Sequence, residues 1–128
     1  MTEARTENGQ PPVRTKDEWQ ALFSAGDISD QHLYELTESL RPKDGEQAVR
    51  RETDGLKFGT DEERPELIIR FLAVQGIDTL GGPAEGVMYD FVNVGDGKVK
   101  VILHEPWGDY SPDQEERSEL VEHLLKFL

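Results

Sequence analysis

The chain has 128 residues, no cysteine and a formal net charge of −13 at pH 7. This composition excludes disulfide bonds, thiolate metal sites and a thiol nucleophile, and the excess of carboxylates disfavours direct binding to nucleic acid or to anionic membranes. The first residues lack the apolar run of a secretory signal, and the longest apolar stretches, near residues 67–74 and 99–103, are too short to span a bilayer. We therefore expect a cytoplasmic protein.

The N-terminal segment, residues 1–13, is polar, contains a Pro-Pro pair and shows no apolar periodicity. Such a segment cannot bury enough apolar surface to offset the entropy lost on ordering it, which predicts a disordered arm. The remaining residues, 14–128, have the length of one ordinary domain and contain no internal repeat.

Two amphipathic helices are predicted at the start of the domain. Thr15 and Glu18 have the spacing of a reciprocal capping box, and the apolar residues that follow lie on one helical stripe that ends at Gly26. Ser29 is the expected N-cap of the second helix. Pro42 should end that helix, because the residue before a proline disfavours the α conformation.

Two β-hairpins are predicted, each from an Asp-Gly pair of the kind that forms type I′ turns. The pair at position 54 predicts a short hairpin over residues 47–59, and the pair at position 96 predicts a longer one over residues 87–105. The longer hairpin carries apolar residues on both of its faces, so we expect cover on one face and partial cover on the other.

Between the hairpins, the sequence predicts a central apolar helix over residues 66–75. Apolar residues from Leu67 onward recur with helical spacing, Pro65 suits the first turn and Gly76 suits the left-handed position after the last turn. The competing interpretation is a buried strand, and the length of the segment together with the glycine at its end favours the helix.

The C-terminal segment has the signature of another helix. Ser111 suits the N-cap, Pro112 suits the first helical position, and Gln114 would complete a capping box. The apolar face of this helix is expected to run to the end of the chain, through Leu120, Val121, Leu124, Leu125 and Leu128. His123 projects away from that stripe and should be solvated.

These elements predict a single α+β domain: two N-terminal helices, a central apolar helix, an antiparallel sheet built on the 87–105 hairpin, and a C-terminal helix packed on the sheet. Three helices followed by a hairpin is also the order of a winged-helix module, which leaves a winged-helix-like regulator as an alternative. A helix that binds a DNA groove carries several basic residues, whereas the predicted third helix is apolar and has one arginine. Such a regulator would therefore bind protein instead.

A candidate pocket lies at the open end of the longer hairpin. In the predicted register Tyr89 faces His104, which Glu105 follows, and Asp90 falls on an apolar strand face where a carboxylate needs a partner. The structural interpretation is a Tyr–His pair across two strands. The functional alternative is a small enzyme or small-molecule-binding domain that uses these side chains for acid–base chemistry.

Acidic residues gather on the C-terminal helix, at Glu115, Glu116, Glu119 and Glu122. A solvated face near a helix N-terminus accounts for them without catalysis. The same carboxylates are suited to electrostatic docking of a basic protein, because charges of one sign on a surface contribute little to folding but steer association.

Known catalytic and cofactor motifs are missing from the sequence, among them the phosphate-binding loop, the zinc-protease motif and the nucleophile elbow. We therefore expect no cofactor, no metal and no catalytic residue. The leading hypothesis is a non-enzymatic, acidic interaction module, such as an adaptor, inhibitor, antitoxin or immunity-type protein, that binds a basic protein partner. The sequence leaves open whether the C-terminal helix packs within one chain or across a homodimer.

Overall fold

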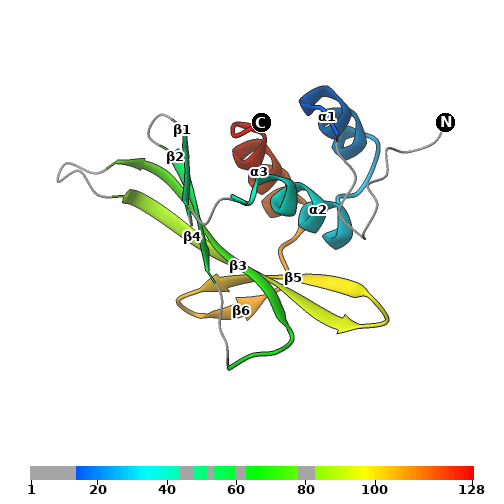
Figure 1. The fold of residues 1–128 in the computed structure, drawn as a ribbon, viewed down its shortest axis with the longest axis vertical. Coiled ribbons are helices and arrows are strands. Elements are labelled where there is room, and N and C mark those ends of the chain that lie inside the picture. The colour runs from blue at the N-terminus through cyan, green and yellow to red at the C-terminus, as the bar shows by residue number, and fades with distance from the viewer. Residues whose placement is uncertain (1–13, 44–47, 52–53, 60–62, 78–82) are drawn as a thin grey trace.

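The computed structural model describes residues 14–43, 48–51, 54–59, 63–77 and 83–128. This part of the chain is α+β, with three helices and an open six-stranded antiparallel sheet whose strands follow sequence order (Figure 1). The elements are α1 (Lys16–Ser24), α2 (Asp30–Leu40), β1 (Ala48–Arg51), β2 (Asp54–Gly59), β3 (Leu67–Ile77), β4 (Pro83–Gly95), β5 (Lys98–Glu105), β6 (Gly108–Tyr110) and α3 (Gln114–Leu125). The predicted arm, residues 1–13, lies outside the described residues. No helix in the described ranges is long and apolar enough to cross a membrane.

The two predicted N-terminal helices are confirmed as α1 and α2. The Thr15 hydroxyl accepts from the Glu18 amide at 3.2 Å, and the Glu18 carboxylate accepts from the Thr15 amide at 2.8 Å, which completes the capping box. Ser29 caps α2 by accepting from the His32 amide at 3.1 Å. Helix α2 ends at Leu40, two residues before the proline that was expected to stop it.

The predicted central helix is wrong, because its residues form strand β3. This strand pairs with β2 along one edge and with β4 along the other. Ile69 and Phe71 are fully buried on one face, while Arg70 and Leu72 lie half-buried on the opposite face. Because both faces of this strand carry apolar residues, the sequence lacks the alternation of apolar and polar residues that would indicate a strand. With no helix at this position, the winged-helix order of elements is excluded as well.

The first predicted hairpin is present as β1 and β2, but the predicted turn is wrong. Arg51 pairs with Asp54, and Arg50 pairs with Gly55, so the Asp-Gly pair lies inside β2. The connection between the two strands falls at residues 52–53, outside the described residues. A Cβ at Gly55 would lie 3.5 Å from the carbonyl oxygen of Val49, which is an ordinary van der Waals contact, so this position does not require glycine for lack of space.

The second predicted hairpin is confirmed as β4 and β5, and its predicted register is wrong by one residue. Three consecutive residues, Gly95, Asp96 and Gly97, have φ values of 104°, 53° and 72°. The Asn93 side chain accepts from the Gly95 amide at 2.9 Å, and Val94 becomes the extra residue of a bulge. The predicted Asp96-Gly97 turn is itself present as a two-residue loop, because Gly95 pairs with Lys98, and the extra residue lies in β4 next to that turn.

That bulge reverses the face on which the later residues of β5 lie. Phe91 pairs with Val101, and His104 pairs with Met88 rather than with Tyr89. A one-residue slip moves every side chain to the other face of a sheet. The predicted Tyr–His cross-strand pair is therefore wrong, and His104 lies on the face of Asp90.

The C-terminal helix α3 is confirmed, but it begins two residues later than predicted. Asp113 is the N-cap and forms a capping box with Glu116, so Ser111 lies outside the helix. The helix ends at Leu125, and Leu128 beyond it is 37% exposed rather than part of the apolar face.

His123 is buried, which contradicts the predicted solvated position. Its side chain is only 2% exposed, with Nε2 3.4 Å from the carbonyl oxygen of Gly55 and the ring 5.4 Å from that of Phe127. Strand β2 thus approaches α3 at Gly55, a contact that the apolar stripe did not indicate.

All three helices pack on one face of the sheet, and the other face carries none of the described helices (Figure 1). At the centre of the covered face, Phe71 stacks with Tyr89 at 5.3 Å and with Phe91 at 6.0 Å between ring centroids. The fully buried side chains of this core include Trp19, Leu33, Leu36, Leu56, Ile69, Phe71, Phe91, Val101 and Leu124.

Polar contacts join the helices to each other and to the sheet. The Asp30 carboxylate accepts from the Val101 amide at 3.1 Å and from the Arg117 guanidinium. Arg117 also donates to the Ile28 carbonyl at 3.1 Å, and the Gln114 side chain bonds both the amide and the carbonyl of Ile28. These bonds fix the start of α2 against β5 and α3.

Candidate functional site

The helix-free face of the sheet is defined by the residues that alternate with the core residues along each strand. Cross-strand partners share a face, so the register places one continuous row across β2 to β6: Lys57, Leu72, Met88, His104 and Asp109. The next row contains Arg70, Asp90 and Ile102. A buried carboxylate at the centre of this face makes it the candidate functional site.

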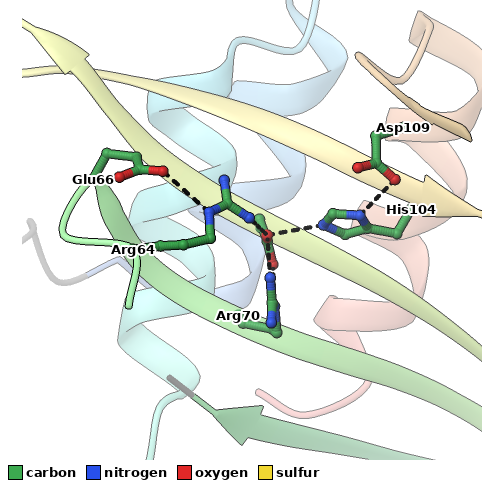
Figure 2. A network of polar contacts seen from close by, with 6 residues as sticks. Arg64, Glu66, Arg70, His104 and Asp109 are labelled. Atoms are coloured by element: carbon green, nitrogen blue, oxygen red, sulfur yellow. Dashed lines mark hydrogen bonds and ion pairs between the residues drawn. The ribbon is translucent and has the colours of Figure 1, made fainter. Parts of the chain in front are cut away.

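Asp90 is fully buried although no helix covers it. Arg70 holds its carboxylate through two hydrogen bonds, from Nε at 2.8 Å and from Nη2 at 2.9 Å. Arg64, from the segment before β3, donates from Nη1 at 3.3 Å, and Arg64 Nε pairs with Glu66 at 3.1 Å. Figure 2 shows the two arginines and His104 converging on this carboxylate.

His104 lies between two carboxylates. Its Nε2 is 2.8 Å from Asp90 Oδ2, and its Nδ1 is 2.7 Å from Asp109 Oδ1 (Figure 2). The imidazolium form can donate to both carboxylates, whereas the neutral ring can donate to only one of them. A carboxylate on each side fixes the orientation of the ring.

The electrostatics of the cluster keep Asp90 ionised. Burial by itself would raise the pKa of the Asp90 carboxyl, but the hydrogen bonds from Arg70 and from His104 outweigh it and lower the pKa below its ordinary value. Four contacts from three cationic or proton-donating side chains occupy the two oxygens. Three of these contacts reach Oδ2 and one reaches Oδ1, so the carboxylate is held within the cluster through both of its oxygens.

The structure brings together two of the four residues of the predicted pocket, Asp90 and His104. The other two, Tyr89 and Glu105, lie on the helix-covered face. Burial, followed by the charges of Glu116 and its acidic neighbours, raises the pKa of Tyr89 to about 12, so its hydroxyl stays protonated. The four side chains therefore do not line a common pocket.

The acidic residues predicted on the last helix divide into two groups. Glu115, Glu119 and Glu122 are exposed at intervals of four and three residues, which places them on one outer stripe of α3. Glu116 instead accepts from the Asp113 amide at 2.9 Å and from the Tyr110 hydroxyl at 2.6 Å. The exposed residues Glu115, Glu119 and Glu122 form the acidic stripe.

Sequence reasoning missed the partners of Asp90 and the cations around them. Arg70 was assigned to a helix, and Arg64 approaches from a turn whose position no pattern indicated. Only the alternation Lys98-Val99-Lys100-Val101 signalled that lysines would line one face of a strand. On the described strands, five cations share the helix-free face: Arg50, Lys57, Arg70, Lys98 and Lys100. Arg64 approaches the same face from the segment before β3.

Within the described ranges, no group of three or more His, Asp or Glu side chains is arranged to hold a metal ion. Comparisons of the chain with protein-family models, with curated proteins and with solved structures found no match.

Proposed function

We propose that this protein is a non-enzymatic interaction module that binds a basic protein partner through the acidic stripe of α3. The observation that carries the proposal is the exposure of Glu115, Glu119 and Glu122 along one side of a well-anchored helix. None of the three forms an ion pair with a residue that the structure describes. Their charge is thus free to meet a partner.

The charge of the whole helical layer strengthens this surface. Helices α1, α2 and α3 together contain nine carboxylates and two lysine or arginine residues, a formal sum of −7. Like charges on a surface oppose folding slightly, so this excess does not stabilise the domain. It does raise the rate at which a cationic surface associates, by electrostatic steering.

The state of the Asp90 cluster also supports a non-enzymatic role. A general base needs a lone pair directed at a substrate proton, and here both oxygens of the buried carboxylate already contact Arg64, Arg70 or His104. The cluster is suited to holding β3, β4 and β5 together on the face that no helix supports.

The test compares three immobilised proteins in a native lysate at low and at high salt: the unaltered chain, Glu115→Gln/Glu119→Gln/Glu122→Gln, and a control with Asp17→Asn/Asp27→Asn/Asp96→Asn. All six positions are exposed, so the two variants lose the same surface charge. We expect the unaltered chain and the control to capture a basic protein at low salt and to release it at high salt. The α3 variant should not capture this protein. Glu116 is left unchanged because it caps the helix.

Association rates of that partner, measured across a salt series, complete the test. Neutralising the acidic stripe should slow association, and the difference should shrink as salt screens the charges. Equal capture and equal rates for the two variants would reject the acidic stripe as the docking surface.

A further inference from the structure

The helix-free face has the opposite charge to the rest of the molecule. Five strand residues on this face are cationic, in a chain whose net charge is −13. Its described strand positions include two carboxylates, Asp90 and Asp109, and both are held within the polar cluster. The helices carry a net negative charge, whereas most charged strand residues of this face are cationic.

The three lysines on the described strands of this face are all exposed. Lys57, Lys98 and Lys100 form no ion pair with any residue in the described ranges, whereas Arg70 is committed to Asp90. At physiological ionic strength charges are screened beyond about 8 Å. A ligand in contact with this face therefore experiences its lysines more strongly than the carboxylates of the helical layer beyond the sheet.

An aliphatic strip lies beside the Asp90 cluster on this face. Leu72 on β3 and Met88 on β4 lie directly opposite each other, and Ile102 lies in the adjacent row. Met88 is 36% exposed. The Leu72 side chain leans over Gly86, where a Cβ would lie 3.1 Å from Leu72 Cδ1. The lysines frame this strip, with Lys57 paired to Leu72 and Lys100 two residues from Ile102.

We propose that the helix-free face binds an acidic segment of a partner protein, whose aliphatic side chains cover Leu72, Met88 and Ile102 and whose carboxylates pair with the surrounding lysines. These contacts involve side chains only. They suit an extended or a helical segment that carries both aliphatic and acidic residues. The site is separate from the acidic stripe, so the protein can hold two partners of opposite charge.

A protein segment fits this face better than a nucleic acid. Single-stranded nucleic acids bind sheet faces by stacking bases on exposed aromatic rings, and the central exposed positions here are aliphatic. The ring of His104 is already held between Asp90 and Asp109. A polyphosphate backbone would also extend beyond the lysines toward the net negative charge of the molecule.

The test measures binding of a fluorescently labelled peptide of Asp-Asp-Leu-Leu repeats by anisotropy. Three proteins are compared: the unaltered chain, Lys57→Glu/Lys100→Glu, and a control with Lys16→Glu/Lys43→Glu. Both variants change two exposed lysines, but Lys16 begins α1 and Lys43 follows the end of α2. We expect the first variant to bind about tenfold or more weakly and the control to change less than about twofold.

Two further probes decide the class of ligand. An Asp-Asp-Ser-Ser peptide should bind at least about tenfold more weakly than the leucine peptide, since it cannot cover the aliphatic strip. A labelled oligothymidylate should not bind at the same salt concentration. Urea denaturation of each variant verifies that its fold is retained.

Several outcomes would overturn the proposal: no binding of the leucine peptide, equal losses in the two lysine variants, equal binding of the serine peptide, or tighter binding of the oligothymidylate. The acidic-stripe variant with three glutamines should bind the leucine peptide at least as well as the unaltered chain. Failure of this proposal is thereby separated from failure of the proposed docking on α3.

Discussion

The two faces of the sheet bury their central residues by different means. On the helix-covered face, Phe71 is enclosed by aromatic and aliphatic side chains, with Tyr89 and Phe91 stacked on it. On the helix-free face, the next residue along β3, Arg70, closes over Asp90. Adjacent residues of one strand thus belong to an apolar core and to an ionic cluster.

This difference shows what an uncovered sheet face requires. A large apolar centre without a helix over it would stay in water or aggregate. Long arginine side chains can instead lie across the sheet, shield a carboxylate with their stems and keep their outer edges hydrated. The helix-covered face is stabilised by the burial of apolar surface. The helix-free face is stabilised by hydrogen bonds that pair the Asp90 carboxylate with cationic side chains.

The largest effect is expected on the covered face. Phe71→Ala should lower the free energy of unfolding by about 3–5 kcal/mol, because it leaves a cavity among three aromatic rings that cannot collapse fully. Met88→Ala on the helix-free face is the matched truncation, and it should cost less than about 1 kcal/mol because Met88 is 36% exposed. Urea denaturation measures both, and similar losses would contradict the assignment of the faces.

The next effect is expected from the ionic cluster. Asp90→Asn should cost about 2–3 kcal/mol, below the range for a fully enclosed pair because Arg64 and Arg70 remain 35% and 25% exposed. Asp96→Asn, at the exposed β4–β5 turn, is the control and should leave stability nearly unchanged. A neutral result for Asp90→Asn would show that the cluster does not support the uncovered face.

The same carboxylate predicts the acid sensitivity of the fold. Since the pKa of Asp90 is lowered on folding, its stabilisation is complete above the unfolded value of about 3.9 and is lost as pH falls through the folded pKa. Urea midpoints measured from neutral pH down to this range should therefore fall more steeply in the unaltered chain than in Asp90→Asn. Parallel curves would contradict the direction of this shift.

A smaller effect, in a different pH window, is expected from the covered face. Burial lowers the pKa of His123, while the Gly55 carbonyl and Asp54 oppose that shift and Lys126 adds to it. The unfolded chain therefore binds the proton more readily, so stability is complete above about pH 6.5 and declines as pH falls through the folded pKa. His123→Leu should flatten this part of the curve, and urea midpoints measured across this pH range for both proteins would show it.

The smallest effect on stability is expected from the lysines of the helix-free face. Lys57→Glu/Lys100→Glu should change the free energy of unfolding by less than about 0.5 kcal/mol, as exposed charges without partners contribute little. Thermal denaturation beside the unaltered chain measures this. A melting temperature lowered by several degrees would mean that these lysines stabilise the sheet and are not available to bind a ligand.

The sequence predicted those elements whose signals are local. The capping box at Thr15 and the Ser29 cap placed α1 and α2 correctly because each depends on atoms three residues apart. It failed at β3, where apolar residues on both faces imitate a helix until two neighbouring strands supply their hydrogen bonds. It failed again at Val94, where one bulged residue changed the register of β5.

The candidate site shows the same division. That Asp90 needed a partner followed from a carboxylate on an apolar strand face, and the sequence identified both Asp90 and His104 as members of a candidate pocket. The bulge decided that His104 is one of these partners. Strand pairing placed Arg70 beside Asp90, and the path of the chain before β3 brought Arg64 to it. The net charge also concealed a basic face, because composition does not say on which side of a sheet a lysine lies.

Composition and local pattern by themselves determined the α+β class, the acidic character, the absence of cysteine chemistry and the positions of the helix caps, since each depends on residue identity or on a few neighbouring bonds. The tertiary structure alone decided that residues 67–77 are a strand, that His123 is buried, that Asp90 is enclosed by two arginines, and that five cations share one face. These features depend on which strands pair and in what register. A single bulged residue in β4 changes the register, and therefore the shared face, of the side chains paired beyond it.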